Sequence, residues 1–218
     1  SNKPSFVLFT SGSTGHPKGI MHSTGGYLLY SKYTCMKQFG LNRKKTILTA
    51  SDAGWINGHT YSLYGPLSTG ATTILIEKPI SLISENFLNK IIFELKVNIL
   101  YLPVTLIRLI KSIGPRNKIK SKHLETLGSM GEPLSKYIGK WFAKKFSEKK
   151  IQIVNTYYQT ETAGIICSPK FNDNVSLTPY GSVGKPVCKE LGVFIEKNLI
   201  ENKNEIKIKN PWPGCMIG

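Results

Sequence analysis

Residues 98–113 read Asn-Ile-Leu-Tyr-Leu-Pro-Val-Thr-Leu-Ile-Arg-Leu-Ile-Lys-Ser-Ile and carry the strongest signal for the fold. The first part, Asn98–Leu102, is a short apolar run, as expected for a strand buried on both faces. The second part has helical spacing, with its apolar side at Leu106, Ile107, Leu109, Ile110 and Ile113. A buried strand followed at once by an amphipathic helix is typical of a parallel sheet with crossover helices.

The same alternation extends in both directions along the chain. Further strand-like runs occupy residues 46–50, 72–76, 124–128 and 151–155. Ser84 can cap a helix whose apolar side holds Phe87, Leu88, Ile91, Ile92 and Leu95. Ser135 can cap another, with Tyr137, Ile138, Trp141, Phe142 and Phe146 inward. We therefore predict an α/β fold with a largely parallel sheet and crossover helices in three layers.

The pattern changes after Thr178. Short strand-like runs around Val183, at 193–195 and at 205–209 are separated by Gly, Pro and Asn. This texture predicts antiparallel β-structure. We expect an α/β unit over residues 1–178 and the start of a small β-rich subdomain over 179–218.

Composition bounds the class of protein. The chain has 218 residues, 40% of them hydrophobic, which excludes a disordered chain, and no apolar run reaches the ~20 residues of a membrane-spanning helix. The net charge of +16 comes from scattered lysines, since Arg43, Arg108 and Arg116 are the only arginines. Because Arg is the preferred reader of phosphate and guanine, we interpret this charge as a solvated surface. A basic RNA-binding module is the alternative.

Cysteine usage and the chain ends bear on the compartment. Cys35, Cys167, Cys188 and Cys215 lie far apart, and neither they nor the four histidines have metal-ligand spacing. Together with the lack of a signal peptide, this predicts a reducing compartment, the cytoplasm, with the nucleus as a second location. Because the sequence begins without Met and stops just after Trp212-Pro213-Gly214, we expect a segment of a longer protein.

A loop rich in glycine and hydroxyl groups is the most specific chemical feature. Residues 9–19 read Phe-Thr-Ser-Gly-Ser-Thr-Gly-His-Pro-Lys-Gly. Glycines let backbone N–H groups converge on an anion, and hydroxyls and a lysine add donors and charge, which suits a polyphosphate. The spacing is not that of a Walker loop, because Gly19-Ile20-Met21 predicts a returning strand. The alternative is a flexible hairpin turn.

Three further segments follow predicted strands. They are Ala53–His59, Gly128–Pro133 and Asn155–Thr162. Ligands of open α/β sheets gather beyond the carboxyl ends of strands, where an aromatic ring can stack on a base and a carboxylate can hold Mg²⁺. Each segment also has a structural interpretation: a core tryptophan with a satisfied histidine, an ordinary turn with Pro, and packed tyrosines with a capping Glu.

Taken together, these motifs resemble the adenylate-forming superfamily of acyl-CoA synthetases, luciferases and peptide-synthetase adenylation domains. Within it they are most similar to the acetyl-CoA synthetase branch. The similarity covers nearly the whole chain and implies the central, nucleotide-binding part of a large N-terminal domain. The motifs that carry it lie at residues 10–19, 25–30, 52–59, 63–67, 70–73, 131–133 and 159–162.

The resemblance implies a set of ATP-binding residues. The phosphate loop would hold the β- and γ-phosphates through Thr10, Ser11, Gly12, Ser13, Thr14, Gly15 and Lys18. The adenine and α-phosphate side would be formed by Gly131, Glu132, Pro133, Asn155, Thr156, Tyr157, Tyr158, Gln159 and Thr160. The ring of Tyr157 would pack on adenine, and Asn155 stands where acetyl-CoA synthetases have Asp. The catalytic set would be Lys18, Thr160 and Glu161, with Glu161 binding Mg²⁺.

The resemblance also implies an acid pocket formed by Trp55, Ile56 and Tyr158. Most members of the superfamily have Gly at the position of Tyr158, and acetyl-CoA synthetases have Trp. A bulky ring there implies a short acid. The coenzyme A site would include Asn57, where the family has Thr, and Ser81, where it has Asn.

The implied reaction is ATP-dependent activation of acetate, or of another short-chain carboxylate, to acyl-AMP and then acyl-CoA, with release of pyrophosphate. ATP, CoA and the acid would be the partners, with Mg²⁺ as cofactor and without a specific nucleic acid or a membrane. The family's ribose-binding Asp, its downstream Arg and its mobile C-terminal domain with the adenylation Lys are not in this sequence, so we expect the segment alone to be inactive. An adenylating enzyme for a different acid and a non-catalytic nucleotide-binding fragment are the alternatives.

Overall fold

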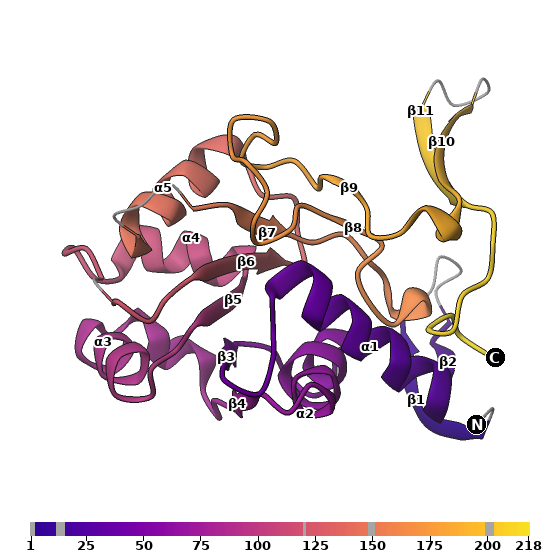
Figure 1. The fold of residues 1–218 in the computed structure, drawn as a ribbon, viewed down its shortest axis with the longest axis horizontal. Helices are drawn as coiled ribbons and strands as arrows, with labels where there is room; N and C mark the ends of the chain where they lie inside the picture. The colour runs from indigo at the N-terminus through magenta and orange to yellow at the C-terminus, as the bar shows by residue number, and fades with distance from the viewer. Residues whose placement is uncertain (1–2, 12–15, 120, 148–150, 199–202) are drawn as a thin grey trace.

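A computed structural model gives the fold of the chain and describes residues 3–11, 16–119, 121–147, 151–198 and 203–218. Its centre is a parallel sheet with the strand order β4-β3-β5-β6-β7 (Figure 1). These strands are β3 (Thr46–Thr49), β4 (Thr72–Ile74), β5 (Ile99–Pro103), β6 (Thr126–Met130) and β7 (Ile153–Asn155). Every neighbouring pair is parallel, which confirms the predicted sheet.

Helices cover both faces of this sheet. Side chains alternate along each strand, so each strand contributes to a core on both faces. Leu100 and Leu102 point into a core shared with α3 (Glu85–Glu94), α4 (Val104–Ile113) and α5 (Lys136–Phe146). Ile99 and Tyr101 point into a second core, shared with α1 (Thr24–Phe39) and the π-helical turn η1 (Gly58–Tyr64). The remaining short helices are α2 (Gly65–Ser68), η2 (Pro79–Ile83), η3 (Thr160–Thr162) and η4 (Lys189–Leu191). The three-layer α/β prediction is confirmed.

Some predicted helix details are wrong. Leu95 and Ile113 are exposed, because α3 ends before Leu95 and α4 ends at Ile113, beyond the core. Tyr137 is also exposed, on the first turn of α5, where the Lys111 ammonium lies 4.8 Å from its ring centroid. The Ser135 hydroxyl accepts a hydrogen bond from the Ile138 N–H, as predicted, whereas Ser84 precedes α3 without such a bond.

Three antiparallel pairs surround the parallel sheet. They are β1 (Pro4–Thr10) with β2 (Lys18–Ser23), β8 (Cys167–Ser168) with β9 (Lys185–Pro186), and β10 (Val193–Asn198) with β11 (Lys203–Ile208). The predicted antiparallel region is thus present, although β8 precedes Thr178. The segment after Thr178 also packs back on the sheet, since the Tyr180 hydroxyl donates to the Ile151 carbonyl over 2.8 Å.

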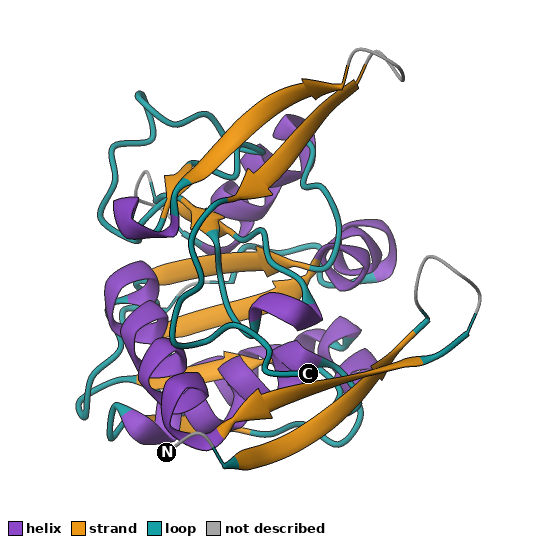
Figure 2. Ribbon diagram, turned by 90° about the vertical axis from the view of Figure 1, so that its right-hand side faces the viewer, coloured by secondary structure: helices purple, strands orange, loops and turns teal. Residues whose placement is uncertain are grey.

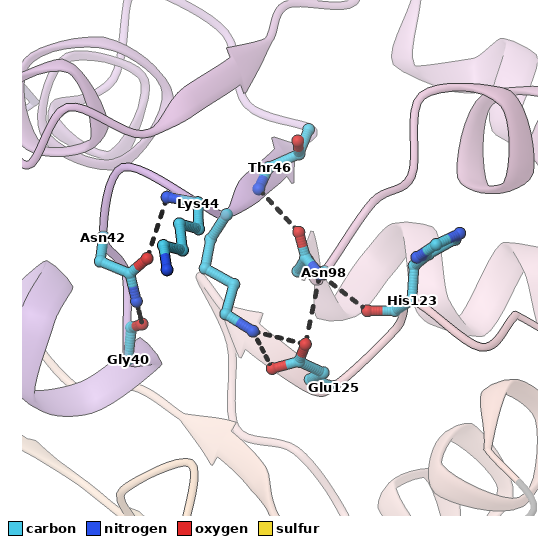
Figure 3. A network of polar contacts seen from close by, with 8 residues as sticks. Gly40, Asn42, Lys44, Thr46, Asn98, His123 and Glu125 are labelled. Carbon is cyan, nitrogen blue, oxygen red and sulfur yellow. Dashed lines mark hydrogen bonds and ion pairs between the residues drawn. The ribbon is translucent and has the colours of Figure 1, made fainter.

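A polar network fastens the amino ends of three strands (Figure 3). The Asn98 side chain accepts a hydrogen bond from the Thr46 N–H over 2.9 Å and donates to the His123 carbonyl and to Glu125 over 3.0 and 3.3 Å. Glu125 also pairs with Lys45. Because β3, β5 and β6 all begin here, the network aligns their starts, and the carboxyl ends meet at the opposite edge.

Candidate functional site

The carboxyl ends of β6 and β7 bring two of the predicted segments together. Ser129 and Asn155 are paired in register across these strands. Directly after β6, Gly131 has φ of 85°, a conformation that favours glycine. The Glu132 carboxylate then accepts a hydrogen bond from Arg108 over 2.9 Å, with both side chains largely exposed. The predicted adenine-side residues of both strands therefore share one edge of the sheet.

A chain of hydroxyl groups runs behind that edge. The Thr156 hydroxyl donates to the Ser129 carbonyl over 2.9 Å and accepts from the Tyr101 hydroxyl over 2.7 Å. The hydroxyl of Tyr158 donates to Oδ1 of Asn57. Burial raises the pKa of Tyr101 and of Tyr158, so both hydroxyls stay protonated and act as donors. The backbone of Tyr157 pairs with Cys167, and its side chain is half-buried.

The turn after Tyr158 holds the predicted α-phosphate and magnesium residues. Gln159 and Thr162 cap η3 reciprocally, which shapes the turn that carries Thr160 and Glu161. The turn ends at Ala163, whose φ of 60° is strained for a residue with a side chain. The Ala163 carbonyl accepts a hydrogen bond from the Thr60 hydroxyl over 2.6 Å, which anchors the turn to η1.

Strand β2 contacts this turn directly. Nε2 of the fully buried His22 donates to the Thr160 carbonyl over 2.8 Å. Burial lowers the pKa of His22, although Thr160, Gly214 and Glu161 act in the other direction. The ring is therefore neutral, and its proton lies on Nε2, which faces the Thr160 carbonyl. The strand that returns from the Gly-rich loop is therefore joined to the residue predicted to contact the α-phosphate.

The last residues of the chain strengthen this junction (Figure 2). The Met21 N–H donates to the Gly218 carbonyl over 2.7 Å, and the Ile217 N–H donates to the Met21 carbonyl over 2.8 Å. The Met216 N–H donates to the backbone carbonyl of Glu161 over 3.0 Å. Residues 216–218 thus link β2 with η3.

The Gly-rich loop is described only at its two ends. Thr10 ends β1 and lies opposite Lys18, the first residue of β2, so the predicted antiparallel return is confirmed. Thr10 is half-buried, whereas Ser11 and Lys18 are exposed. The other predicted loop residues, Gly12, Ser13, Thr14 and Gly15, lie outside the described part of the chain.

The predicted acid-pocket residues come together in part. Ile56 and Tyr158 belong to one apolar cluster that also holds Tyr27 and Ala163. Trp55 is 69% exposed. Of the two predicted CoA-binding residues, Asn57 is buried against Tyr158, whereas Ser81 lies on η2, which packs with α3 and α4 in the other helical layer.

The sequence reasoning missed His22, Thr60 and Tyr101 as parts of this site. A signal existed in two cases, because Tyr101 carries a hydroxyl in an otherwise apolar strand and His22 directly follows Ile20 and Met21 in β2. Such residues need a hydrogen-bond partner when buried. Alternation along the strand predicts their burial, but it does not identify the partner.

Glu161 is the carboxylate on the turn that is predicted to hold the metal. Among the described residues, no three His, Cys, Asp or Glu side chains come close enough to hold a metal ion together. Mg²⁺ is commonly held by one or two carboxylates together with phosphate oxygens. The half-buried Glu161, which interacts electrostatically with His22, fits that arrangement.

A basic cavity lies elsewhere. It has a volume of about 680 Å³ and is lined by Lys111, Arg116, Lys118, Lys144 and Lys145, together with neutral residues. Three of these lysines lie in the last turns of α4 and α5, where they complement the helix dipoles. The Lys145 ammonium also donates to the Asn117 carbonyl over 2.5 Å. These contacts favour the interpretation of the positive charge as part of the fold and its solvated surface.

Comparison with known proteins identifies what the chain is similar to. Residues 1–210 match the family described as AMP-binding enzyme. An acetyl-coenzyme A synthetase from Psychromonas ingrahamii is 36% identical over 221 residues, which cover 98% of this chain and 33% of that protein. The protein of the same name from Methylorubrum populi is 37% identical over 225 residues, covering 98% and 33%. The chain spans about a third of the length of the curated relatives it matches. No described helix is long and apolar enough to cross a membrane.

Proposed function

Because the chain belongs to the family of AMP-binding enzymes, we propose that the full-length protein activates a short-chain carboxylic acid with ATP, with acetate as the preferred acid. The acid and ATP would form acyl-AMP and pyrophosphate, and coenzyme A would then take the acyl group. The names of the relatives support this reaction class. They are bacterial proteins, which supports a cytoplasmic location and lends no support to the nucleus.

The observation that carries the proposal is the hydrogen bond from His22 to the Thr160 carbonyl. It joins the strand behind Lys18 to the turn of Thr160 and Glu161, although 138 positions separate the two residues. A loop suited to the β- and γ-phosphates and a hydroxyl suited to the α-phosphate would then face the same nucleotide. Tyr158, two residues before Thr160, would receive the acid beside the α-phosphate.

In the first step, a carboxylate oxygen attacks the α-phosphorus, the new O–P bond forms, and the bond to the pyrophosphate oxygen breaks. Lys18 and the loop hydroxyls would hold the departing pyrophosphate, and Thr160 would orient the α-phosphate. Such chemistry depends on positioning and on neutralising charge. Mg²⁺, when bound through Glu161, would supply part of that neutralisation. In the second step, the CoA sulfur attacks the acyl carbon and AMP leaves, for which Asn57 and Ser81 are the predicted contacts.

Acid-dependent exchange of pyrophosphate into ATP by the full-length protein tests this function. We expect exchange with acetate, weaker exchange with propionate, and thioester formation when CoA is added. Exchange without thioester would favour an adenylating enzyme with another acyl acceptor. Absence of exchange with every short acid would favour the non-catalytic nucleotide-binding alternative.

A further inference from the structure

The side chain of Asn57 is partnered at one end only, as far as the described residues show. Asn57 is 6% exposed. Its Oδ1 accepts a hydrogen bond from the Tyr158 hydroxyl, although 101 positions separate the two residues. Its Nδ2 is buried and has no hydrogen-bond partner among the described residues.

The directions of the hydrogen bonds among the hydroxyl groups explain why Tyr158 bonds the oxygen of the Asn57 amide and not its nitrogen. The proton of Thr156 goes to the Ser129 carbonyl, so the Tyr101 hydroxyl donates to Thr156 over the short distance of 2.7 Å. Tyr101 lies farther, 3.5 Å, from the Tyr158 hydroxyl. Tyr158 therefore gives its proton to Asn57 Oδ1, and the amide N–H group is the donor that remains.

Asn57 directly follows a residue of an apolar cluster. The preceding residue, Ile56, belongs to a cluster with Tyr27, Ala163 and the ring of Tyr158. The Ala163 carbonyl is already used by Thr60. Buried donors in proteins are nearly always paired, because an unpaired one loses its hydration without compensation. Since Nδ2 and Oδ1 share one carbon, the N–H group lies beside the Tyr158 hydroxyl.

We propose that this N–H group recognises an oxygen on the chain of the bound acid, so that the site takes short 2-hydroxy acids in preference to unsubstituted acids of equal size. The proposal rests on the proposed function, in which Tyr158 borders the acid site. It assigns to Asn57 a role in choosing the acid, separate from the predicted contact with CoA.

Glycolate and propionate make the sharpest comparison, because they differ by a hydroxyl in place of a methyl group. The hydroxyl oxygen of glycolate can accept from Asn57, whereas the methyl group of propionate leaves the amide unpaired. Sites built to hydrogen-bond a substrate hydroxyl discriminate strongly against the analogue that lacks it. We expect kcat/KM for glycolate to exceed that for propionate by about ten- to a hundredfold.

The test measures acid-dependent pyrophosphate exchange by the full-length protein with acetate, propionate and glycolate. Asn57→Leu keeps the size of the side chain and removes both ends of the amide, so the glycolate-to-propionate ratio is expected to fall to about one. Tyr158→Phe removes the hydroxyl and leaves the amide, so the ratio is expected to stay in favour of glycolate. Gln152→Leu is the matched control, because Gln152, directly before β7, is another buried amide with one end that has no partner among the described residues. Its ratio should equal that of the parent.

Three results would overturn the inference. The first is a parent that uses acetate and propionate but not glycolate, which leaves the proposed function intact. The second is a ratio that falls in Tyr158→Phe but not in Asn57→Leu, which would make the tyrosine hydroxyl the recognising group. The third is a protein that activates none of the acids, which would reject the proposed function together with the inference.

Discussion

The Asn155 side-chain amide donates a hydrogen bond to the Gly181 carbonyl over 3.1 Å. It also donates to the Ser182 carbonyl over 3.3 Å, and its oxygen accepts from the Ser129 hydroxyl over 2.9 Å. Every polar group of this side chain thus has a partner within the protein. The amide thereby fastens residues 181–182 over the end of β7.

This contact predicts that Asn155→Asp destabilises the fold. The substitution would place a carboxylate against two carbonyl oxygens at a position that is 2% exposed. The variant loses the amide N–H donor and buries a carboxylate oxygen in its place. This should lower the free energy of unfolding, measured by urea denaturation, by about 1–3 kcal/mol. Asn42→Asp is the control, because Asn42 makes similar local bonds in an exposed turn. Equal stability of the two variants would contradict the role given to Asn155.

Replacement of Lys18 should weaken the use of ATP. Loss of a charge-assisted contact to phosphate typically costs about 1.5–3 kcal/mol, so Lys18→Ala should lower kcat/KM for ATP about ten- to a hundredfold. Lys18→Arg, which keeps the charge, should retain more activity. Lys140→Ala, on the exposed side of α5, is the control and should match the parent. Normal exchange by Lys18→Ala would remove the phosphate loop from the proposed site.

Glu161 should act through its charge. Mg²⁺ prefers hard anionic oxygen ligands, so Glu161→Gln, which is nearly isosteric, should raise the Mg²⁺ concentration needed for half-maximal exchange. The fold should survive, because the Met216 N–H contacts the backbone carbonyl of Glu161 and not its carboxylate. Glu94→Gln at the exposed end of α3 serves as the control. An unchanged Mg²⁺ requirement would leave Glu161 with only a structural role.

The ring of Tyr158 should limit the length of the acid. A longer acid must displace a ring that packs edge-on against Tyr61 at a centroid distance of 5.6 Å. Overpacking of this kind costs about 1–3 kcal/mol, and one methylene is discriminated by a similar amount. We expect acetate to be preferred, propionate tolerated and octanoate refused, whereas Tyr158→Gly should shift kcat/KM toward butyrate and octanoate at the expense of acetate. If kcat/KM depends on acid length in the same way in the parent and in Tyr158→Gly, the Tyr158 ring does not limit the length of the acid.

The positive charge should give weak binding to nucleic acid without sequence preference. Non-specific binding to phosphates falls steeply with salt, so affinity for mixed-sequence RNA should disappear near physiological ionic strength in a fluorescence anisotropy titration. Lys144→Glu in the basic cavity and Lys32→Glu on α1 should weaken the low-salt binding equally. A much larger effect of Lys144→Glu, or selective binding at physiological salt, would favour an RNA-binding module.

Much of the architecture followed from local patterns. Buried strands such as Ile99–Pro103 are apolar apart from the Tyr101 hydroxyl, and helices such as α4 repeat their apolar residues every three or four positions. These periodicities depend on which face of an element is buried, so short windows of sequence contain them. The same logic placed Asn155 at a strand end and the Gly-rich loop between two antiparallel strands. It failed at helix termini such as Ile113, where periodicity continues after the core has ended.

The pairings within the candidate site could not be read in this way. His22 meets Thr160 and Asn57 meets Tyr158 across more than a hundred positions of the chain, and Asn155 binds the carbonyl groups of Gly181 and Ser182. A polar residue in an apolar run indicates that a partner is needed, but many partners would satisfy it equally well. The choice among them depends on how β2, η1 and η3 pack around the carboxyl edge of the sheet, because a hydrogen bond requires two groups within about 3 Å and in the right orientation.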